Sequence, residues 1–136
     1  MATIRKEIVL RASPDAVWSA VRDVGEVHRR LVPGVLVDAR LDGDARVVTF
    51  ANGLVVRERI VDVDDEARRF CWSAVGGRLS HHNASMQVFP DGSGARLVWI
   101  CDLLPDEMEP AIRTLIDAGS AALKKTLESA DARASV

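Results

Sequence analysis

Near the N-terminus, hydrophobic and polar residues alternate in the way that is typical of a half-buried β-strand. Between residues 3 and 11, Ile4, Ile8 and Leu10 share one parity, and charged residues occupy much of the other. We therefore expect this segment to be a strand with one face in the core.

Two short helices are expected after this strand. Ser13 can cap the first helix and Pro14 suits its first position, so a helix is predicted over residues 14–22. A second helix is predicted over residues 25–31. It should end at Val32-Pro33-Gly34, because proline restricts the residue before it and glycine favours a turn.

The segment from residue 35 to residue 104 consists of β-rich runs separated by short polar breaks. Each break carries the glycine, asparagine or acidic residues that are common in hairpin turns. The breaks are Asp42-Gly43-Asp44, Asn52-Gly53, Asp64-Asp65-Glu66, Gly76-Gly77 and Pro90-Asp91-Gly92-Ser93-Gly94. Six strands joined in this way form an antiparallel meander, and the first strand can add a seventh.

The C-terminal segment, from Asp106 to about Glu128, carries an apolar stripe with the period of an α-helix. At about 1.5 Å per residue this helix would be about 34 Å long, close to the width of seven strands that lie about 4.8 Å apart. We therefore predict an α+β fold in one domain over residues 1–136. In it, a curved seven-stranded antiparallel sheet wraps on one long C-terminal helix, with two short helices after the first strand.

The turn at Asn52-Gly53 decides which side chains of its two strands face the core. A three-residue loop ending in a left-handed Gly53 places all the large apolar residues inside, whereas a two-residue turn would leave Phe50 outside. Burial of each large side chain contributes about 1.5 to 3 kcal/mol, which favours the three-residue loop. The pairs in this register are Phe50 with Leu54, Val48 with Val56 and Arg46 with Glu58.

This register sends two charged side chains, Arg46 and Glu58, into the space beneath the long helix. An unpaired charge there would be very costly, whereas an ion pair is tolerable. The pair can be purely structural, joining two strands. Alternatively, it can line a cavity and hydrogen-bond a carbonyl or hydroxyl group of a ligand. The same reasoning at the next turn pairs Ile60 with Phe70 and Glu58 with Trp72.

The histidines near the start of the sixth strand differ in the face they are expected to occupy. Parity places His82 and Met86 inside and His81 outside. The final strand allows two registers. In one of them Asp102 lies opposite His82 and can orient its imidazole as a general base. In the other, Trp99 faces inward and Asp102 only ends the strand. The alternative for His82, which is the more common state of a buried polar side chain, is a hydrogen-bonded histidine of the core or rim without a role in chemistry.

Charge and hydropathy exclude several classes of partner. Eighteen basic and twenty acidic residues give a net charge of −2, which argues against nucleic acid as a partner. No run of about 20 uncharged apolar residues occurs, and the first residues lack the pattern of a signal peptide. We therefore expect no insertion into membranes and a cytoplasmic location.

Metal and cofactor chemistry have no support in the motifs. Cys71 and Cys101 are too far apart for a CxxC pair, and His81 and His82 point to opposite faces of one strand. The Walker A, GxSxG and GxGxxG patterns are absent, as is tyrosine. We expect no metal, no cofactor and no proton transfer by tyrosine.

Several segments together resemble the SRPBCC superfamily, the START-related group of polyketide cyclases, dehydrases and lipid-transport proteins with the helix-grip fold. The resemblance covers nearly the whole chain. It rests on the segment from Ala12 to Trp18, Asp23, Val32-Pro33-Gly34, Arg46, Gly53, the segment from Val56 to Ile60, and the segment from Trp99 to Pro105.

The resemblance implies a cavity between the sheet and the long helix that admits an apolar small molecule. The residues expected to line it are Arg46, Phe50, Trp72, Met86, Trp99, Ile112, Leu115 and Gly119. Glu58, His82 and Asp102 are the candidate acid–base residues for cyclase or dehydratase chemistry on a polyketide-like or aromatic ligand. The alternatives are a lipid or small-molecule carrier or sensor without chemistry, and an interaction protein whose outer sheet face docks another subunit, for example as a homodimer.

Overall fold

One antiparallel sheet of seven strands forms most of the structure, a computed structural model that describes the backbone of residues 1–134 and the side chains of residues 1–130. The spatial order is β1-β7-β6-β5-β4-β3-β2, so the first strand closes the meander beside the last. The strands are β1 (Ala2–Leu10), β2 (Leu36–Asp42), β3 (Ala45–Phe50), β4 (Val55–Asp64), β5 (Arg69–Val75), β6 (His81–Asp91) and β7 (Gly94–Leu104). The expected seven strands and their antiparallel pairing are confirmed.

The helices follow the local signals of the sequence. The first is α1 (Pro14–Arg22), which begins at Pro14 and is capped by the Ser13 hydroxyl, an acceptor for the Ala16 amide at 3.1 Å. The second expected helix is split into a 3₁₀ turn and a single α-helical turn. The remaining elements are η1 (Val24–Glu26), α2 (Val27–Arg30), η2 (Asp106–Met108) and α3 (Glu109–Ala134).

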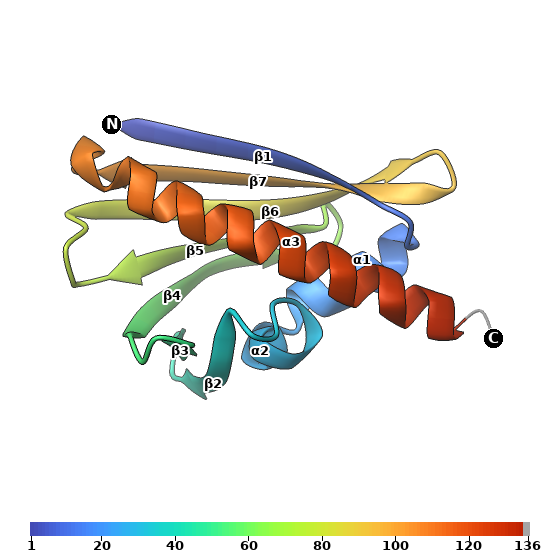
Figure 1. Ribbon diagram of the computed structural model, residues 1–136, viewed down its shortest axis with the longest axis horizontal. Coiled ribbons are helices and arrows are strands. Elements are labelled where there is room, and N and C mark those ends of the chain that lie inside the picture. The colour runs from blue at the N-terminus through green and yellow to red at the C-terminus, as the bar shows by residue number, and fades with distance from the viewer. Residues whose placement is uncertain (135–136) are drawn as a thin grey trace.

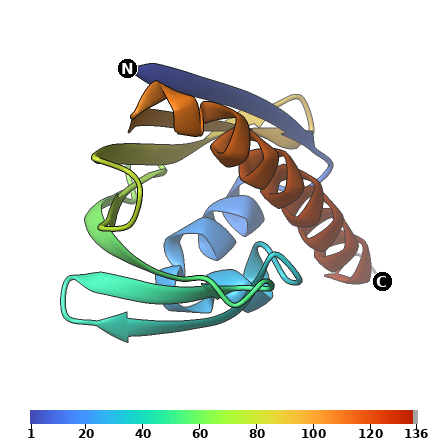
Figure 2. The same cartoon turned by 60° about the vertical axis from the view of Figure 1, so that its left-hand side comes forward.

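The sheet curves around α3, which crosses its concave face diagonally (Figure 1). Figure 2 shows the sheet bending from β1 down to β2 and β3, with α1 and α2 beneath one end of the long helix. This is the helix-grip arrangement predicted from the sequence, and the fold class is confirmed. No helix of the described residues is long and apolar enough to span a membrane.

The two halves of α3 are held differently. In the second half, Leu123 and Leu127 are buried in the core, and Lys124 Nζ donates a hydrogen bond to the Val9 carbonyl at 2.6 Å. Glu128 accepts the amide of Arg11 at 2.8 Å. Near the middle of α3, Asp117 accepts a hydrogen bond from Lys6 Nζ of β1 at 2.9 Å. The residues before Asp117 lie over a cavity, so the side-chain bonds between α3 and β1 begin at Asp117.

The expected register between β4 and β5 is wrong by two residues. Glu58 lies opposite Ala74, and Trp72 lies opposite Ile60, because the ladder is shifted by an irregularity at Val61 and the connecting turn is longer than expected. Trp72 therefore does not stand directly across from the Glu58 carboxylate.

Candidate functional site

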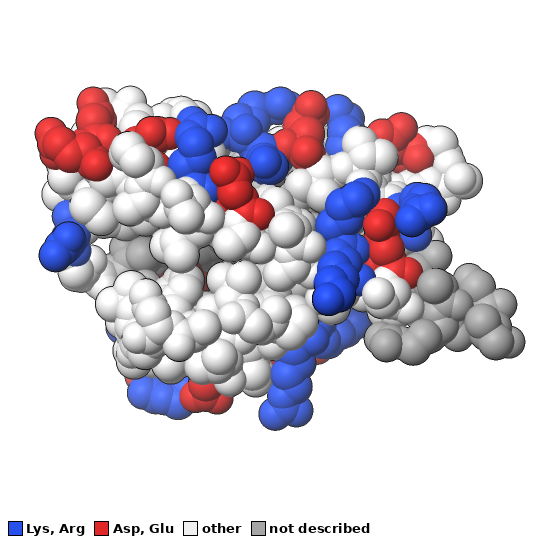
Figure 3. All heavy atoms as spheres, viewed as in Figure 1, with Lys and Arg blue, Asp and Glu red and all other residues white. Residues whose placement is uncertain are grey.

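A cavity of about 670 Å³ lies between the sheet and the first half of α3. Its walls come from both halves of the sheet, from α2 and the loop after it, and from α3. Figure 3 shows its mouth as a hollow on the left, surrounded mostly by uncharged side chains. Rim residues include Leu54, which was expected in the core but is 53% exposed, together with Val55 and Val75.

The structure brings together all but one of the residues singled out in the sequence. Those that line the cavity are Arg46, Phe50, Trp72, Met86, Trp99, Ile112, Leu115, Gly119, Glu58 and His82. Asp102 does not line it. The lining is therefore mainly apolar, and its charged or titratable side chains are Arg46, Glu58, Arg78, His82 and Cys101.

The Arg46–Glu58 register is confirmed, and the pair is buried. Arg46 Nε donates to Glu58 Oε1 at 2.8 Å, and the side chains are only 5% and 13% exposed. Arg46 Nη1 also donates to the Val24 carbonyl at 3.1 Å. Its guanidinium carbon lies 5.0 Å from the Phe70 ring and 5.7 Å from the Trp72 ring. Ion pair, carbonyl and aromatic rings together hold the arginine in place.

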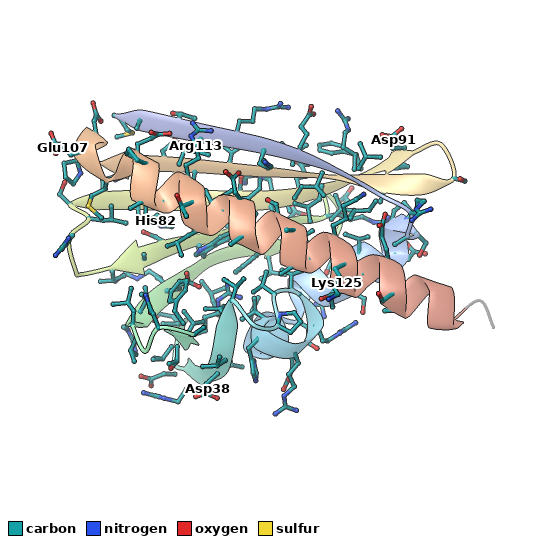
Figure 4. The ribbon with its side chains drawn as sticks, viewed as in Figure 1. Asp38, His82, Asp91, Glu107, Arg113 and Lys125 are labelled. Atoms are coloured by element: carbon teal, nitrogen blue, oxygen red, sulfur yellow. The ribbon has the colours of Figure 1, made fainter. Side chains whose placement is uncertain are left out.

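His82, labelled in Figure 4, is half-buried in the cavity wall, and its hydrogen bond defines the tautomer of the neutral ring. Its Nδ1 accepts the backbone amide of Ala74 at 2.9 Å, so a neutral ring must carry its proton on Nε2. Burial lowers the pKa of His82 below its ordinary value of 6.5; the nearby Glu58 carboxylate opposes this shift and His81 adds to it. In the described part of the chain Nε2 has no hydrogen-bond partner, which leaves it free to donate to a ligand.

The alignment of Asp102 with His82 is wrong. A two-residue turn between β6 and β7 pairs His82 with Leu103 and Asp102 with Asn83. Asp102 Oδ1 accepts a hydrogen bond from the Thr3 hydroxyl at 2.7 Å, outside the cavity. The alternative register holds instead, with Trp99 as a wall of the cavity. Asp102 cannot orient the His82 ring.

Two residues of the site were not among the site residues predicted from the sequence. Phe70 is 1% exposed, stacks on Trp72 with ring centroids 5.0 Å apart, and supports the Arg46 guanidinium. Its parity with Trp72 in β5 could have identified it. Ala74 supplies only its amide to His82, so no signal in its side chain marks that role.

Neither cysteine is placed as a nucleophile. Cys101 lines the cavity, but burial raises the pKa of its thiol to about 11, which keeps it protonated near neutrality. Burial also raises the pKa of Cys71, which lies in β5 beneath the outer face. Among the described residues, no three histidine, cysteine or acidic side chains are grouped as a metal site would require.

Gly119 of α3 packs against the Trp99 ring of β7. A Cβ atom added at this position would lie 2.9 Å from Cη2 of Trp99 and 3.1 Å from its Cζ3. Glycine costs an α-helix about 1 kcal/mol relative to alanine, so packing has overridden helix propensity here.

We expect Gly119→Ala to destabilise the protein by about 1 to 2 kcal/mol, because overpacking outweighs the gain in helix propensity. Urea denaturation measures the change. In a Trp99→Phe background the clashing indole atoms are missing, so the same substitution should become stabilising. A stabilising effect of Gly119→Ala in the wild-type background would contradict the contact.

Known proteins share this fold. The family described as polyketide cyclase / dehydrase and lipid transport matches residues 1–128. XoxI from Bacillus cereus superimposes with a TM-score of 0.84 at 18% identity, over 93% of this chain and 96% of XoxI. The di-domain ARO/CYC protein BexL of the BE-7585A biosynthetic pathway superimposes with a TM-score of 0.80 at 18% identity, over 94% of this chain and 47% of BexL.

Norcoclaurine synthase from Thalictrum flavum, solved with a transition-state analogue, gives a TM-score of 0.66 at 19% identity, over 93% of each chain. At these identities the likeness concerns the fold alone. No curated protein sequence matches the chain.

Proposed function

The chain belongs to the polyketide cyclase/dehydrase and lipid transport family, and from this premise we propose that it binds an apolar small molecule, aromatic or polyketide-like, between the sheet and α3. The observation that supports this most is the cavity itself. Its volume of about 670 Å³ lies within the range of about 300 to 1,000 Å³ that is usual for small-molecule sites.

The polar groups in the wall define the ligand further. Arg46 is held by its partners, but the second oxygen of Glu58 and Nε2 of His82 have no hydrogen-bond partner among the described residues. A ligand with a hydroxyl for the carboxylate and a carbonyl for the imidazole N–H would satisfy both. Trp72 and Trp99 supply flat apolar surfaces for its rings.

Blocking the cavity tests the proposal. Leu115→Trp places a larger side chain in the cavity, and we expect the affinity for 1-anilinonaphthalene-8-sulfonate to fall at least about tenfold, with loss of any small molecule that copurifies. Ala118→Trp is the matched control, because Ala118 is exposed on the same helix and does not line the cavity.

Fluorescence titration and native mass spectrometry provide the two measurements. Equal dye affinity in the wild type, Leu115→Trp and Ala118→Trp would contradict binding in this cavity. Thermal melting of each variant shows whether any loss of binding reflects unfolding.

Acid–base chemistry is a second candidate function, favoured by the presence of a carboxylate and an imidazole N–H in one apolar wall. Glu58 would take a proton from a carbon next to a ligand carbonyl, while His82 Nε2–H stabilises the enolate oxygen. The enolate carbon would then attack a second carbonyl of the ligand. The alkoxide so formed would recover the proton from Glu58, so the enzyme returns to its starting state. BexL is described as an ARO/CYC protein, a name that fits ring formation of this kind.

A further inference from the structure

The hydrogen bonds between β5 and β6 change character at His82. The backbone ladder ends with the pair Trp72 and Ala84, and continuation of the same register would place Ala74 opposite His82. There the imidazole accepts the Ala74 amide in place of a backbone carbonyl, and the Ser73 hydroxyl donates to the His82 carbonyl. Side chains therefore join the two strands where their backbones no longer pair.

A second depression, of about 450 Å³, lies at this place on the outer face of the sheet. Its walls are polar and include Arg59, Ser73, His81 and Asp102. The residues that line both this depression and the inner cavity are Ala74, Val75, Gly76, Leu79 and His82. Only these shared residues separate the outer depression from the inner cavity.

We propose that this gap is a second opening of the cavity, to the outer face of the sheet, and that the His82 imidazole is its gate. The ring closes the gap while Nδ1 accepts the Ala74 amide. An imidazolium carries protons on both nitrogens and has no acceptor, so protonation must break this bond. The strands then keep only the Ser73 contact across the gap, which opens for water and small polar groups.

The charged surroundings decide when the gate opens. On the cavity side the ring faces Glu58 of β4, with Arg46 of β3 beyond it, and Arg78 of the β5–β6 connection also lines the cavity. On the outer side lie Arg59, His81 and Asp102. Glu58 favours the imidazolium, while burial and His81 disfavour it, and the pKa is lowered overall. The gate should therefore stay closed at neutral pH and open only below the ordinary pKa of histidine.

Amide hydrogen exchange tests the gate without any ligand. We expect the protection factor of the Ala74 amide to fall at least about tenfold between about pH 7.5 and about pH 5, in step with the titration of the His82 ring followed by NMR. The Ala84 amide, in the adjacent intact ladder, serves as the internal reference and should keep its protection.

His82→Gln is the matched variant, because its side-chain oxygen can accept the Ala74 amide but does not titrate. Its Ala74 protection should not respond to pH. The proposal is overturned if Ala74 stays protected while the wild-type ring becomes protonated, or if protection falls equally in His82→Gln.

A second measurement rests on the proposed function as well. His82→Gly removes the gate, so bound 1-anilinonaphthalene-8-sulfonate should dissociate faster at every pH, whereas from the wild type it should dissociate faster only at low pH. Failure of the dye to bind at all would contradict the proposed function and leave the exchange result to decide the gate. Equal dissociation rates in the wild type, His82→Gln and His82→Gly at low pH would contradict the second opening.

Discussion

Replacing Arg46 by methionine should lower the free energy of unfolding by about 3 to 5 kcal/mol. The Glu58 side chain, 13% exposed, would lose its only charged partner within 4 Å among the described residues. The Val24 carbonyl would also lose its donor, and the Phe70 and Trp72 rings their cation. Denaturation in guanidinium chloride measures the loss.

The double variant Arg46→Met/Glu58→Leu should recover much of this stability, because no charge is left unpaired. Arg57→Met is the matched control. Arg57 lies in β4 next to Glu58, but its pair with Asp42 is exposed on the other face, so its loss should matter far less. Comparable losses for Arg46→Met and Arg57→Met would refute a special role for the buried pair.

If the cavity supports acid–base catalysis, Glu58→Gln should reduce kcat by about 10²- to 10⁴-fold on a ligand with two carbonyl groups, while the ligand still binds. Glutamine has nearly the same shape and can still accept a hydrogen bond from Arg46, but it cannot take up a proton. His82→Ala should also reduce kcat, because it removes the N–H that would stabilise the enolate oxygen.

Single-turnover kinetics, with affinity measured separately, distinguishes this loss from a loss of binding. Asp102→Asn is the control, since that carboxylate lies outside the cavity and bonds to Thr3. Unchanged turnover in both Glu58→Gln and His82→Ala would contradict catalysis by these two residues, whereas binding without turnover in the wild type would indicate a carrier. A loss in Asp102→Asn equal to theirs would show that the effect does not come from the cavity.

The ion pair could be predicted because one local feature fixes it. Gly53 adopts a left-handed conformation, and the Phe50 amide bonds to the Leu54 carbonyl, which is the three-residue loop inferred from the need to bury Phe50. From that loop the pairing of Arg46 with Glu58 follows by alternation alone. Strand facing is set by apolar burial, and apolar burial is visible in the sequence.

The errors arose where the ladder departs from simple alternation. The turn that pairs Asp64 with Arg69 shifts the expected register by three residues, and the irregularity at Val61 reduces this shift to two. Nothing in the residue types there marks either feature. At the turn between β6 and β7, a difference of one residue in loop length separates the alignment of Asp102 with His82 from the observed alignment with Asn83. Parity could place His82 inside the sheet but could not show that its ring would replace a backbone acceptor.

The two parts of α3 are held to the rest of the structure to different degrees. Asp117, Lys124 and Glu128 hold the later part of α3 to β1 and to Arg11, which follows it. Residues 109–115 lie over the cavity. We expect ligands of different size to be accommodated by a tilt of the N-terminal part of α3, while its C-terminal part and the core beneath that part stay in place. The protein should therefore bind a series of ligands that differ in width, and should discriminate among them chiefly by the positions of their oxygen atoms.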